Sequence, residues 1–323
     1  MNKIKILIPV YNDWHSVSKL LENINSEVST LEGIFSVTIV NDASIENRPE
    51  FLSDLSNLNF VQIINMKENR GHARCNAAGL KHINEKEDFD YIIPMDGDGE
   101  DRPQEISLLI EKIKEYPDIV VTANRVKRSE SLIFKICYLA HKYLTLVFTG
   151  QTIKYGNYTC LPKSAVNAMV NEPATWSSFS GSLAKTAKDK KSIPSERGTR
   201  YFGPSKMSFI NLLKHSLSII AVFKKILIIR SALFLTVYLF LVAGHISFIT
   251  LIPVMAVIAM LISAIVLSKR ENKIEFNNAL KNIESIDKIK WKELILILII
   301  TLILIPSFAA MVEIRGAYSK DLS

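Results

Sequence analysis

The chain has 323 residues, of which 48% are hydrophobic and 22% are charged, a balance that argues against intrinsic disorder and favours a protein partly embedded in lipid. Its formal net charge of +7 suits an anionic partner, such as a membrane surface, a phosphate-bearing substrate or a nucleic acid. Three widely spaced cysteines without a C-x-x-C pair exclude a disulfide framework and a thiolate zinc site, and they fit a reducing, cytosolic setting.

Short β-branched runs alternate with longer helical patterns over residues 1–125. The runs are KIKILIPV, SVTIVN, FVQIIN, DYIIPM and IVVTAN. This alternation predicts a mostly parallel α/β sheet. Ligands of such sheets bind beyond the carboxyl ends of the strands, so the residues that follow each run are the first candidates for a functional site.

An acidic turn, MDGDGED, follows the fourth run and precedes a helix that Pro103 opens. Its carboxylates are those of Asp96, Asp98, Glu100 and Asp101. Carboxylates this close repel one another, and Mg²⁺ or Mn²⁺ bound by one or two of them plus substrate phosphates would relieve the repulsion. The alternative is a turn that only faces solvent or caps the helix.

The ends of the first three runs carry groups that suit a nucleotide. Tyr11 and Asp13 follow the first run and Asp42 follows the second, which places an aromatic ring and carboxylates where a base could stack and form hydrogen bonds. After the third run, Gly71 would admit a close backbone approach, and Arg74 could meet a phosphate. Each feature alone could be ordinary turn chemistry. Together they predict a nucleotide-diphosphate cleft.

Asp, Glu, Lys and Arg are absent from residues 231–268 and from residues 294–312. A helix needs about 20 residues to cross a bilayer, so these lengths predict three transmembrane helices. We expect the spans at about 231–248, 250–268 and 294–312, with a bend near Gly244 to Thr250. The alternative is a helical hairpin buried in a soluble core.

Basic residues indicate how the spans are oriented. Lys224, Lys225 and Arg230 precede the first span, and the loop 269–293 between the second and third spans is rich in lysine. The positive-inside rule places both segments, and with them the N-terminal half, in the cytosol. We therefore expect a multi-pass protein of the bacterial inner membrane with a cytosolic catalytic domain.

Two further stretches, residues 131–149 and 208–230, are rich in apolar residues with sparse lysine and histidine. Their lysines could reach lipid headgroups while the apolar side chains enter the acyl boundary, which predicts interfacial helices. Packing against the sheet is an equal alternative for 131–149 and a weaker one for the second stretch, which leads into a span.

The motifs IPVYND, VNDAS, ENRGHA and DGDGED occur in this order and resemble those of a GT-A glycosyltransferase of family 2. The stretch Arg200–Lys206 resembles the R-x-x-G-x-S-K signature of its polyprenyl-phosphate glycosyltransferases, the dolichol-phosphate mannose synthase group. The resemblance implies a Rossmann-like GT-A domain over residues 1–207. A juxtamembrane helix over 208–230 and a transmembrane region over 231–313 would follow it.

The resemblance also implies roles for individual residues. Those expected to bind the nucleotide are Pro9, Tyr11, Asp13, Asp42, Gly71, Arg74 and Asp96. Those expected to hold Mg²⁺ or Mn²⁺ are Asp96, Asp98 and Glu100. Those expected to bind the acceptor phosphate and the departing diphosphate are Arg125, Arg200, Ser205 and Lys206. The expected catalytic set is Asp96, Asp98, Arg125, Arg200 and Lys206.

The implied reaction is transfer of one sugar, with inversion, from a UDP- or GDP-sugar to a polyprenyl phosphate such as undecaprenyl phosphate, for a cell-envelope glycan. Processive synthesis is disfavoured because the chain lacks the Q-x-x-R-W motif. The chain departs from the group's pattern at Asp13, where Glu is commoner, and at Asn41, where the first acid of D-D-x-S is usual. Residues 153–161 stand where the group commonly has an acidic residue and a Gly-Phe-Arg-like run.

Two other functions stay open at this stage. One is a catalytically silent protein of the same fold that acts as a membrane scaffold or binds lipid, and the other is a transferase with a different lipid acceptor. Nucleic-acid binding is not expected, because the lysine cluster of residues 185–191 lacks interleaved aromatic residues. Exposed apolar spans would also allow homo-oligomers to form.

Overall fold

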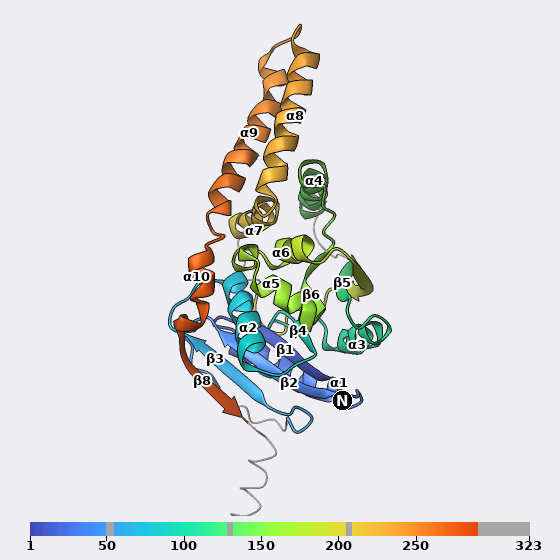
Figure 1. The fold of residues 1–323 in the computed structure, drawn as a ribbon, viewed down its shortest axis with the longest axis vertical. Helices are drawn as coiled ribbons and strands as arrows, with labels where there is room; N and C mark the ends of the chain where they lie inside the picture. The colour runs from blue at the N-terminus through green and yellow to red at the C-terminus, as the bar shows by residue number, and fades with distance from the viewer. Residues whose placement is uncertain (50–54, 128–131, 205–208, 290–323) are drawn as a thin grey trace, which may run out of the picture.

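The structure is a computed structural model that describes residues 1–49, 55–127, 132–204 and 209–289. Within these ranges, one eight-stranded sheet lies at the centre of the protein, in the order β7-β5-β6-β4-β1-β2-β3-β8 (Figure 1). The strands are β1 (Lys3–Val10), β2 (Ile34–Asn41), β3 (Val61–Met66), β4 (Tyr91–Pro94), β5 (Val120–Lys127), β6 (Tyr155–Pro162), β7 (Lys190–Glu196) and β8 (Ile283–Ile289).

The sheet is mixed. β1 pairs in parallel with β2 and β4, β2 with β3, and β5 with β7. The antiparallel pairs are β3 with β8, β4 with β6, and β5 with β6. The predicted α/β architecture is confirmed, and the five predicted runs form β1 to β5. β5 extends beyond the predicted run IVVTAN, through Lys127, in its pairing with β7.

Helices cover both faces of the sheet. Successive residues of a strand point to opposite faces, so Ile4, Ile6 and Ile8 pack with α1 and α3 while Leu7 packs with α2 and α5. The α-helices are α1 (Trp14–Val28), α2 (His72–Lys86), α3 (Ile106–Glu115), α4 (Leu132–Thr149), α5 (Lys163–Val170), α6 (Phe179–Thr186), α7 (Phe209–Ala221), α8 (Lys224–Val242), α9 (Phe248–Ser268) and α10 (Lys273–Asn277). The short 3₁₀ helices are η1 (Pro103–Glu105), η2 (Pro173–Trp176) and η3 (Ala279–Asn282).

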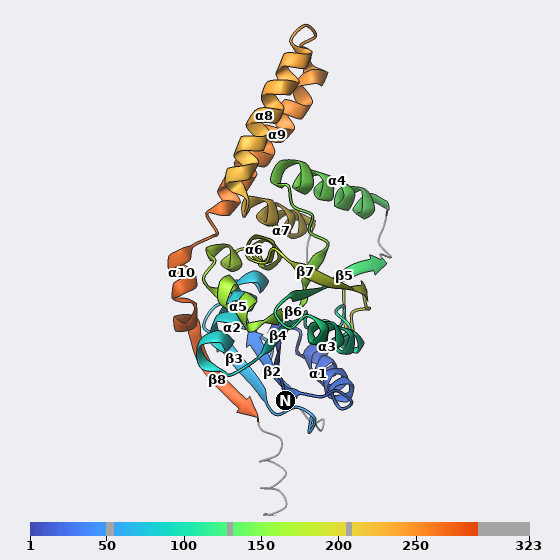
Figure 2. The same cartoon turned by 45° about the vertical axis from the view of Figure 1, so that its right-hand side comes forward.

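The carboxyl ends of the parallel strands face the hairpin that α8 and α9 form. β8 runs antiparallel to β3, and its arrow points away from this hairpin in both views (Figures 1 and 2). β1, β2, β3 and β4 therefore point toward the hairpin. A ligand that binds beyond the strand ends would lie on the same side of the sheet as the hairpin.

The hairpin projects from the body of the protein (Figure 1). Both of its helices are long and apolar enough to cross a membrane, with hydropathies of 2.1 and 2.7, and only 11% and 17% of their apolar windows are buried. So little burial argues against the alternative in which the hairpin is the core of a soluble protein, whose helices are mostly buried. The turn at residues 243–247 agrees with the expected bend, and Ser247 and Thr250 form a capping box that starts α9.

The expected helix over residues 208–230 is in fact two helices. α7 ends at Ala221 and α8 begins at Lys224, because Val222 and Phe223 turn inward and pack with Ala174. The basic residues that were expected to precede the first span consequently lie within the first turns of α8.

The remaining membrane segments fall partly outside the described residues. α9 begins at Phe248 and ends at Ser268, close to the expected second span, and the expected third span at 294–312 lies outside the described residues. The described part of the expected loop 269–293 is not irregular, since it forms α10, η3 and β8 and returns to the sheet beside β3.

α4 and α7 lie beside the base of the hairpin (Figure 2). Arg230 of α8 donates hydrogen bonds to the carbonyl oxygens of Leu146 at 3.3 Å and Val147 at 3.0 Å, at the C-terminal end of α4, where a cation is favourable. α4 also exposes apolar side chains, among them Leu139 and Tyr143. An interfacial position for α4 and α7 stays a prediction.

Replacing Ile258 with Lys tests whether α9 lies in lipid. Ile258 is near the middle of α9 and 44% exposed, so the change should be nearly neutral in water, whereas a lysine near the centre of a bilayer costs about 2.5–3.5 kcal/mol. We expect the Ile258→Lys variant to lose much of its carbonate-resistant membrane fraction. Leu108→Lys, on α3 and 41% exposed, is the matched control. Equal membrane fractions for both variants would contradict a lipid-facing α9.

Candidate active site

Polar residues follow the neighbouring strands β4, β1 and β2 at their carboxyl ends. Residues 11–13 follow β1, Asp42 follows β2, and the acidic turn of residues 95–101 follows β4. The backbone N–H of Asp42 donates to the carbonyl of Val10 at 2.9 Å, which holds two of these ends together. Pro9 lies inside β1 opposite Val40. The parallel register thus brings the predicted strand-end residues to one edge of the sheet.

Hydrogen bonds join the loops after β1 and β2. The Asn12 N–H donates to Ser44 Oγ at 2.9 Å, and the Ile45 N–H donates to Asn12 Oδ1 at 2.9 Å. Asn12 and Ala43 have φ angles of 50° and 55°, an uncommon conformation for residues other than glycine that clusters at functional sites. Tyr11 lies at this rim and is 43% exposed, so its ring is available to a ligand.

Asp42 holds the loop that precedes α2. It is 4% exposed, and its two carboxylate oxygens accept from the backbone N–H groups of Arg70 and Gly71, each at 2.8 Å. Gly71 has a φ of 91°, which explains glycine at this point. The described contacts of Asp42 are therefore structural, and its expected contact with a nucleoside stays a prediction.

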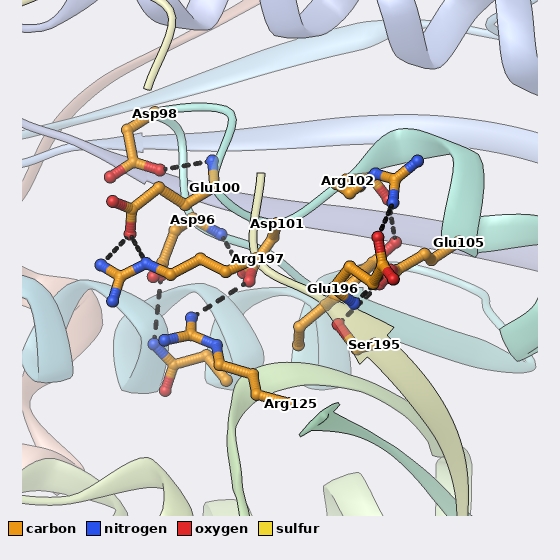
Figure 3. A network of polar contacts seen from close by, with 12 residues as sticks. Asp96, Asp98, Glu100, Asp101, Arg102, Glu105, Arg125, Ser195, Glu196 and Arg197 are labelled. Carbon is orange, nitrogen blue, oxygen red and sulfur yellow. Dashed lines mark hydrogen bonds and ion pairs between the residues drawn. The ribbon is translucent and has the colours of Figure 1, made fainter. Parts of the chain in front are cut away.

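Asp96 is the centre of a polar network at the end of β4. Its Oδ1 contacts His72 Nε2 at 3.0 Å and accepts from Asn157 Nδ2 at 3.2 Å. Its backbone N–H donates to Asp101 Oδ2 at 2.9 Å, and Asp101 Oδ1 lies 3.5 Å from a guanidinium nitrogen of Arg125 (Figure 3). Arg125 thus contacts the acidic turn, and its expected role at the acceptor phosphate stays a prediction.

The crowding of these carboxylates shifts their pKa values in opposite directions. Desolvation opposes the charged form of Asp96, but its ion pair with His72 prevails and holds the pKa of Asp96 below its usual value. Desolvation also opposes the charged form of His72, and the negative charge of Asp96 prevails there too, so the pKa of His72 is raised. Desolvation, followed by repulsion from Asp96, raises the pKa of Asp98 to about 6 and that of Asp101 to about 7. The site therefore favours an additional cation.

Arg200 bridges the acidic turn and the loop after β1. Its two terminal nitrogens donate to Asp98 Oδ2 at 2.5 Å and to Asp13 Oδ2 at 2.7 Å. The three side chains are only 16–19% exposed, so these pairs are partly shielded from solvent. The structure thereby brings together three predicted site residues that are far apart in the sequence.

The segment around Arg200 runs along the acidic turn. The Gly198 N–H donates to the carbonyl of Glu100 at 2.8 Å, and the Tyr201 N–H donates to the carbonyl of Asp98 at 3.0 Å. Arg197 pairs with the carboxylate of Glu100 (Figure 3). The first part of the predicted signature therefore lies at the site, whereas Ser205 and Lys206 lie outside the described residues.

Arg74 is turned toward a different part of the protein from the acidic turn. Its guanidinium carbon lies 5.5 Å from the centre of the Trp176 ring, and the indole N–H of Trp176 donates to Glu275 at 3.0 Å. Burial, and next the positive charge of Arg270, lower the pKa of Arg74. Its expected contact with the nucleotide stays a prediction.

Asn157 and Arg197 belong to the site but were assigned no role from the sequence. Asn157 lies within the run that departs from the group's pattern, and Arg197 lies just before the predicted signature. The excess of carboxylates in MDGDGED was a signal that more partners were needed. The sequence could not identify them, because both come from strands and loops distant in the chain.

The carboxylates suit a divalent cation shared with phosphates. Within the described residues, no group of three or more His, Cys, Asp and Glu side chains is arranged to hold a metal ion. Mg²⁺ commonly binds through one or two carboxylates together with substrate phosphates. Asp98 already attracts a cationic group, the guanidinium of Arg200. The residues present therefore fit a metal that one or two carboxylates hold. Glu100 likewise pairs with an arginine, Arg197, and its expected role as a metal ligand stays a prediction.

Comparison with solved structures supports the GT-A fold. Glucosyl-3-phosphoglycerate synthase from Mycobacterium tuberculosis, solved with Mn²⁺, UDP and glucosyl-3-phosphoglycerate, matches with a TM-score of 0.51 and 11% identity over 70% of this chain and 80% of that chain. Another complex described for that enzyme, with Mn²⁺, UDP-glucose and phosphoglyceric acid, gives the same values. At this identity the likeness concerns the fold alone.

The family follows from the sequence comparison. The family model for glycosyl transferase family 2 matches residues 5–177, more than half of the chain, and the chain belongs to this family. Curated relatives include undecaprenyl-phosphate 4-deoxy-4-formamido-L-arabinose transferases of Klebsiella pneumoniae and Proteus mirabilis, each 29% identical over 220 residues. These matches cover 66% of this chain and 65% of the relatives' length. The predicted fold and family are thus confirmed.

Gly99→Ala tests the fit between the acidic turn and the segment around Arg200. Gly99 has a φ of 89°, and an added Cβ would lie 2.6 Å from the ring of Tyr201. We expect a loss of about 1–3 kcal/mol in the free energy of unfolding, measured by denaturation. Gly156→Ala is the control, because no atom lies within 4 Å of its added Cβ and its φ is not positive. Equal stability of the two variants would mean that the contact is loose.

Proposed function

We propose that this protein is a membrane-bound inverting glycosyltransferase that moves one sugar from a nucleotide-diphosphate sugar to a polyprenyl phosphate. One observation carries the proposal. Asp98 of the acidic turn pairs with Arg200 of the predicted acceptor signature, at the strand ends that face the hairpin. Arg200, which could bind a phosphate, and Asp98, which could bind a metal ion, are therefore in contact on the side of the sheet where a lipid acceptor would arrive.

On the donor side, the proposal assigns the nucleoside to the rim formed by Tyr11, Asp13 and Asp42. Asp96 and Asp98 would hold Mg²⁺ or Mn²⁺, which supplies positive charge for the departing diphosphate. The family membership supports a sugar donor, and the solved relative with bound Mn²⁺ and UDP supports this choice of ligands. The proposed donor is a UDP- or a GDP-sugar.

On the acceptor side, the names of the curated relatives support undecaprenyl phosphate. A phosphate monoester has its second pKa near 6, so the acceptor is already ionised at neutral pH and needs no strong general base. One of its oxygens forms a bond to the anomeric carbon while the bond from that carbon to the nucleoside diphosphate breaks. The enzyme must hold two anions at reacting distance, a task that suits Arg200, Arg125 and Lys206.

The proposed location is the inner membrane, with the catalytic body in the cytosol. The base of the hairpin carries Lys224, Lys225, Arg230, Lys269 and Arg270. Residues 243–247, at its tip, carry no lysine or arginine. This asymmetry supports a cytosolic body under the positive-inside rule.

A transfer assay with the full chain in membranes tests the proposal. Labelled UDP- and GDP-sugars are supplied with undecaprenyl phosphate and Mg²⁺ or Mn²⁺, and label is measured in the lipid phase. We expect metal-dependent label with one donor. Absence of label with every donor would overturn the proposal in favour of a silent scaffold, and label that persists without the polyprenyl phosphate when other lipids are present would assign a different acceptor.

Asp98→Asn should lower the rate of transfer at least about 100-fold while the protein stays folded. A neutral amide binds the proposed cation poorly and releases Arg200. Initial rates of label transfer and a thermal unfolding curve measure the two effects. Asp118→Asn, an exposed residue after α3, is the control for the same chemical change. Unchanged turnover of Asp98→Asn would remove Asp98 from the metal site.

Lys206→Ala should mainly raise the KM for the lipid phosphate, because the proposal places its ammonium group at the acceptor. Steady-state rates with each substrate varied in turn measure this effect. If the KM for the sugar nucleotide rises and that for the lipid does not, Lys206 belongs to the donor side.

A further inference from the structure

β8 brings two polar side chains to the rim of the proposed donor site. It follows the hairpin in sequence and lies outside residues 5–177, the part that the family model matches. Ser285 and Asp287 are two residues apart and project to the same face of the sheet. In the antiparallel pair with β3, Ser285 lies opposite Asn65, close to the end of β3.

A chain of hydrogen bonds leads from these two residues to the loop after β2. Asn65 Nδ2 donates to Ser285 Oγ at 2.9 Å and to Asp287 Oδ2 at 3.3 Å. The same Asp287 oxygen accepts from Arg48 Nη1 at 2.8 Å. Asn41 Nδ2 in turn donates to Asn65 Oδ1 at 3.0 Å. Asn41 Oδ1 then accepts from the backbone N–H of Ser44 at 3.0 Å.

The groups at the two ends of this series of hydrogen bonds determine which side chain donates and which accepts at each step. A carboxylate can only accept hydrogen bonds, so Asp287 requires the NH₂ group of Asn65 to point toward β8. The side-chain oxygen of Asn65 then faces Asn41, so Asn41 must donate to it from its own NH₂ group. At the other end, the backbone N–H of Ser44 can only donate, and it meets the remaining oxygen of Asn41. Reversing either amide would place like groups against each other.

The loop after β2, where this series of hydrogen bonds ends at Ser44, belongs to the proposed nucleoside rim. Ser44 Oγ accepts from the Asn12 N–H, which joins the loops after β1 and β2. The same loop contains Asp42, whose carboxylate holds the backbone at Arg70 and Gly71. The orientation of the Asn41 amide therefore affects the loop after β2 and, through Ser44, the loop after β1 that contains Tyr11.

We infer that Asp287, through Asn65 and Asn41, is a positioning residue that shapes the nucleoside rim and sets the hydrogen-bonding polarity of position 41. The inference rests on the proposed function, since it assumes that a nucleoside diphosphate binds at this rim. It also explains why position 41 is Asn where the related group usually has an acid. An aspartate there would keep the Ser44 N–H on one oxygen, but its other oxygen would face the oxygen of Asn65 without a donor between them.

The test is a double-mutant cycle on nucleotide affinity with the full chain in detergent, using UDP and GDP with Mn²⁺ in calorimetry. Asn41→Asp should weaken binding about ten-fold, because it places two acceptors in contact. Asp287→Asn should weaken binding about two- to three-fold, because it weakens the ion pair with Arg48 and replaces a group that can only accept with an amide that can also donate. In the double variant, the amide at position 287 can donate to a reversed Asn65, which then donates to the new carboxylate, while Arg48 gives up its ion pair. Affinity should therefore return to within about three-fold of the wild type.

A purely structural role would give a different pattern, in which the two substitutions weaken binding additively. Glu284→Gln controls for net charge alone, because it removes one negative charge from the same strand on the opposite face and leaves the Arg48–Asp287 ion pair intact. It should not restore binding to the Asn41→Asp variant. Simple charge compensation is tested with salt, since it should fade between about 0.1 M and about 1 M, as the Debye length falls from about 10 Å to about 3 Å.

The outcomes separate this inference from the proposed function. Restoration by Asp287→Asn that persists at high salt supports the inference. Additive losses, restoration by Glu284→Gln, or restoration that disappears at high salt would overturn it while leaving the proposed function intact. If the wild-type protein binds neither UDP nor GDP, the proposed function fails and the inference fails with it.

Discussion

The concentration of negative charge at the end of β4 is the constraint on which the arrangement of this protein depends. Carboxylates packed this closely destabilise a fold unless cations approach them. Each is matched by a group from a distant part of the chain: Asp96 by His72, Asp98 by Arg200, Glu100 by Arg197 and Asp101 by Arg125. The acidic turn therefore organises α2, β5 and the segment after β7 around one point. The same carboxylates are the groups that a phosphate-bound cation would use.

The position of this point in the sheet connects it with the membrane hairpin. Parallel strands leave their carboxyl ends on one edge, and in this protein that edge faces α8 and α9. Under the proposed function, a lipid phosphate at the membrane surface and a soluble sugar nucleotide would approach the site from different sides. The guanidinium of Arg200, held between Asp13 and Asp98, lies where both anions would meet.

Much of this organisation could be predicted from the sequence, but not all of it. β1 to β5 are recognisable because β-branched runs end at turn residues, and the acidic turn because its residues are contiguous. β6, β7 and β8 contain Gly, Pro or several charged residues, so their sequences lack the pattern of a buried strand. The partners of Asp96 depend on pairings between distant segments, such as the one that brings in Asn157. The direction in which the amide of Asn65 points could not be predicted, because it depends on which groups lie beside it in the folded protein.

The ties between the hairpin and the catalytic body lie at both ends of the hairpin. At the start of α8, Phe223 packs into the body. The next residue, Lys224, lies 3.5 Å from Glu271 at the exit of α9, so the two ends of the hairpin are joined to each other. Beyond that exit, Phe276 of α10 stacks on Trp176, with ring centres 5.7 Å apart, before β8 joins the sheet. A hairpin held at one end could swing about that contact. Because both ends are held, a membrane around the hairpin would keep the strand ends at a constant depth and tilt, which is what transfer to a lipid-borne phosphate requires.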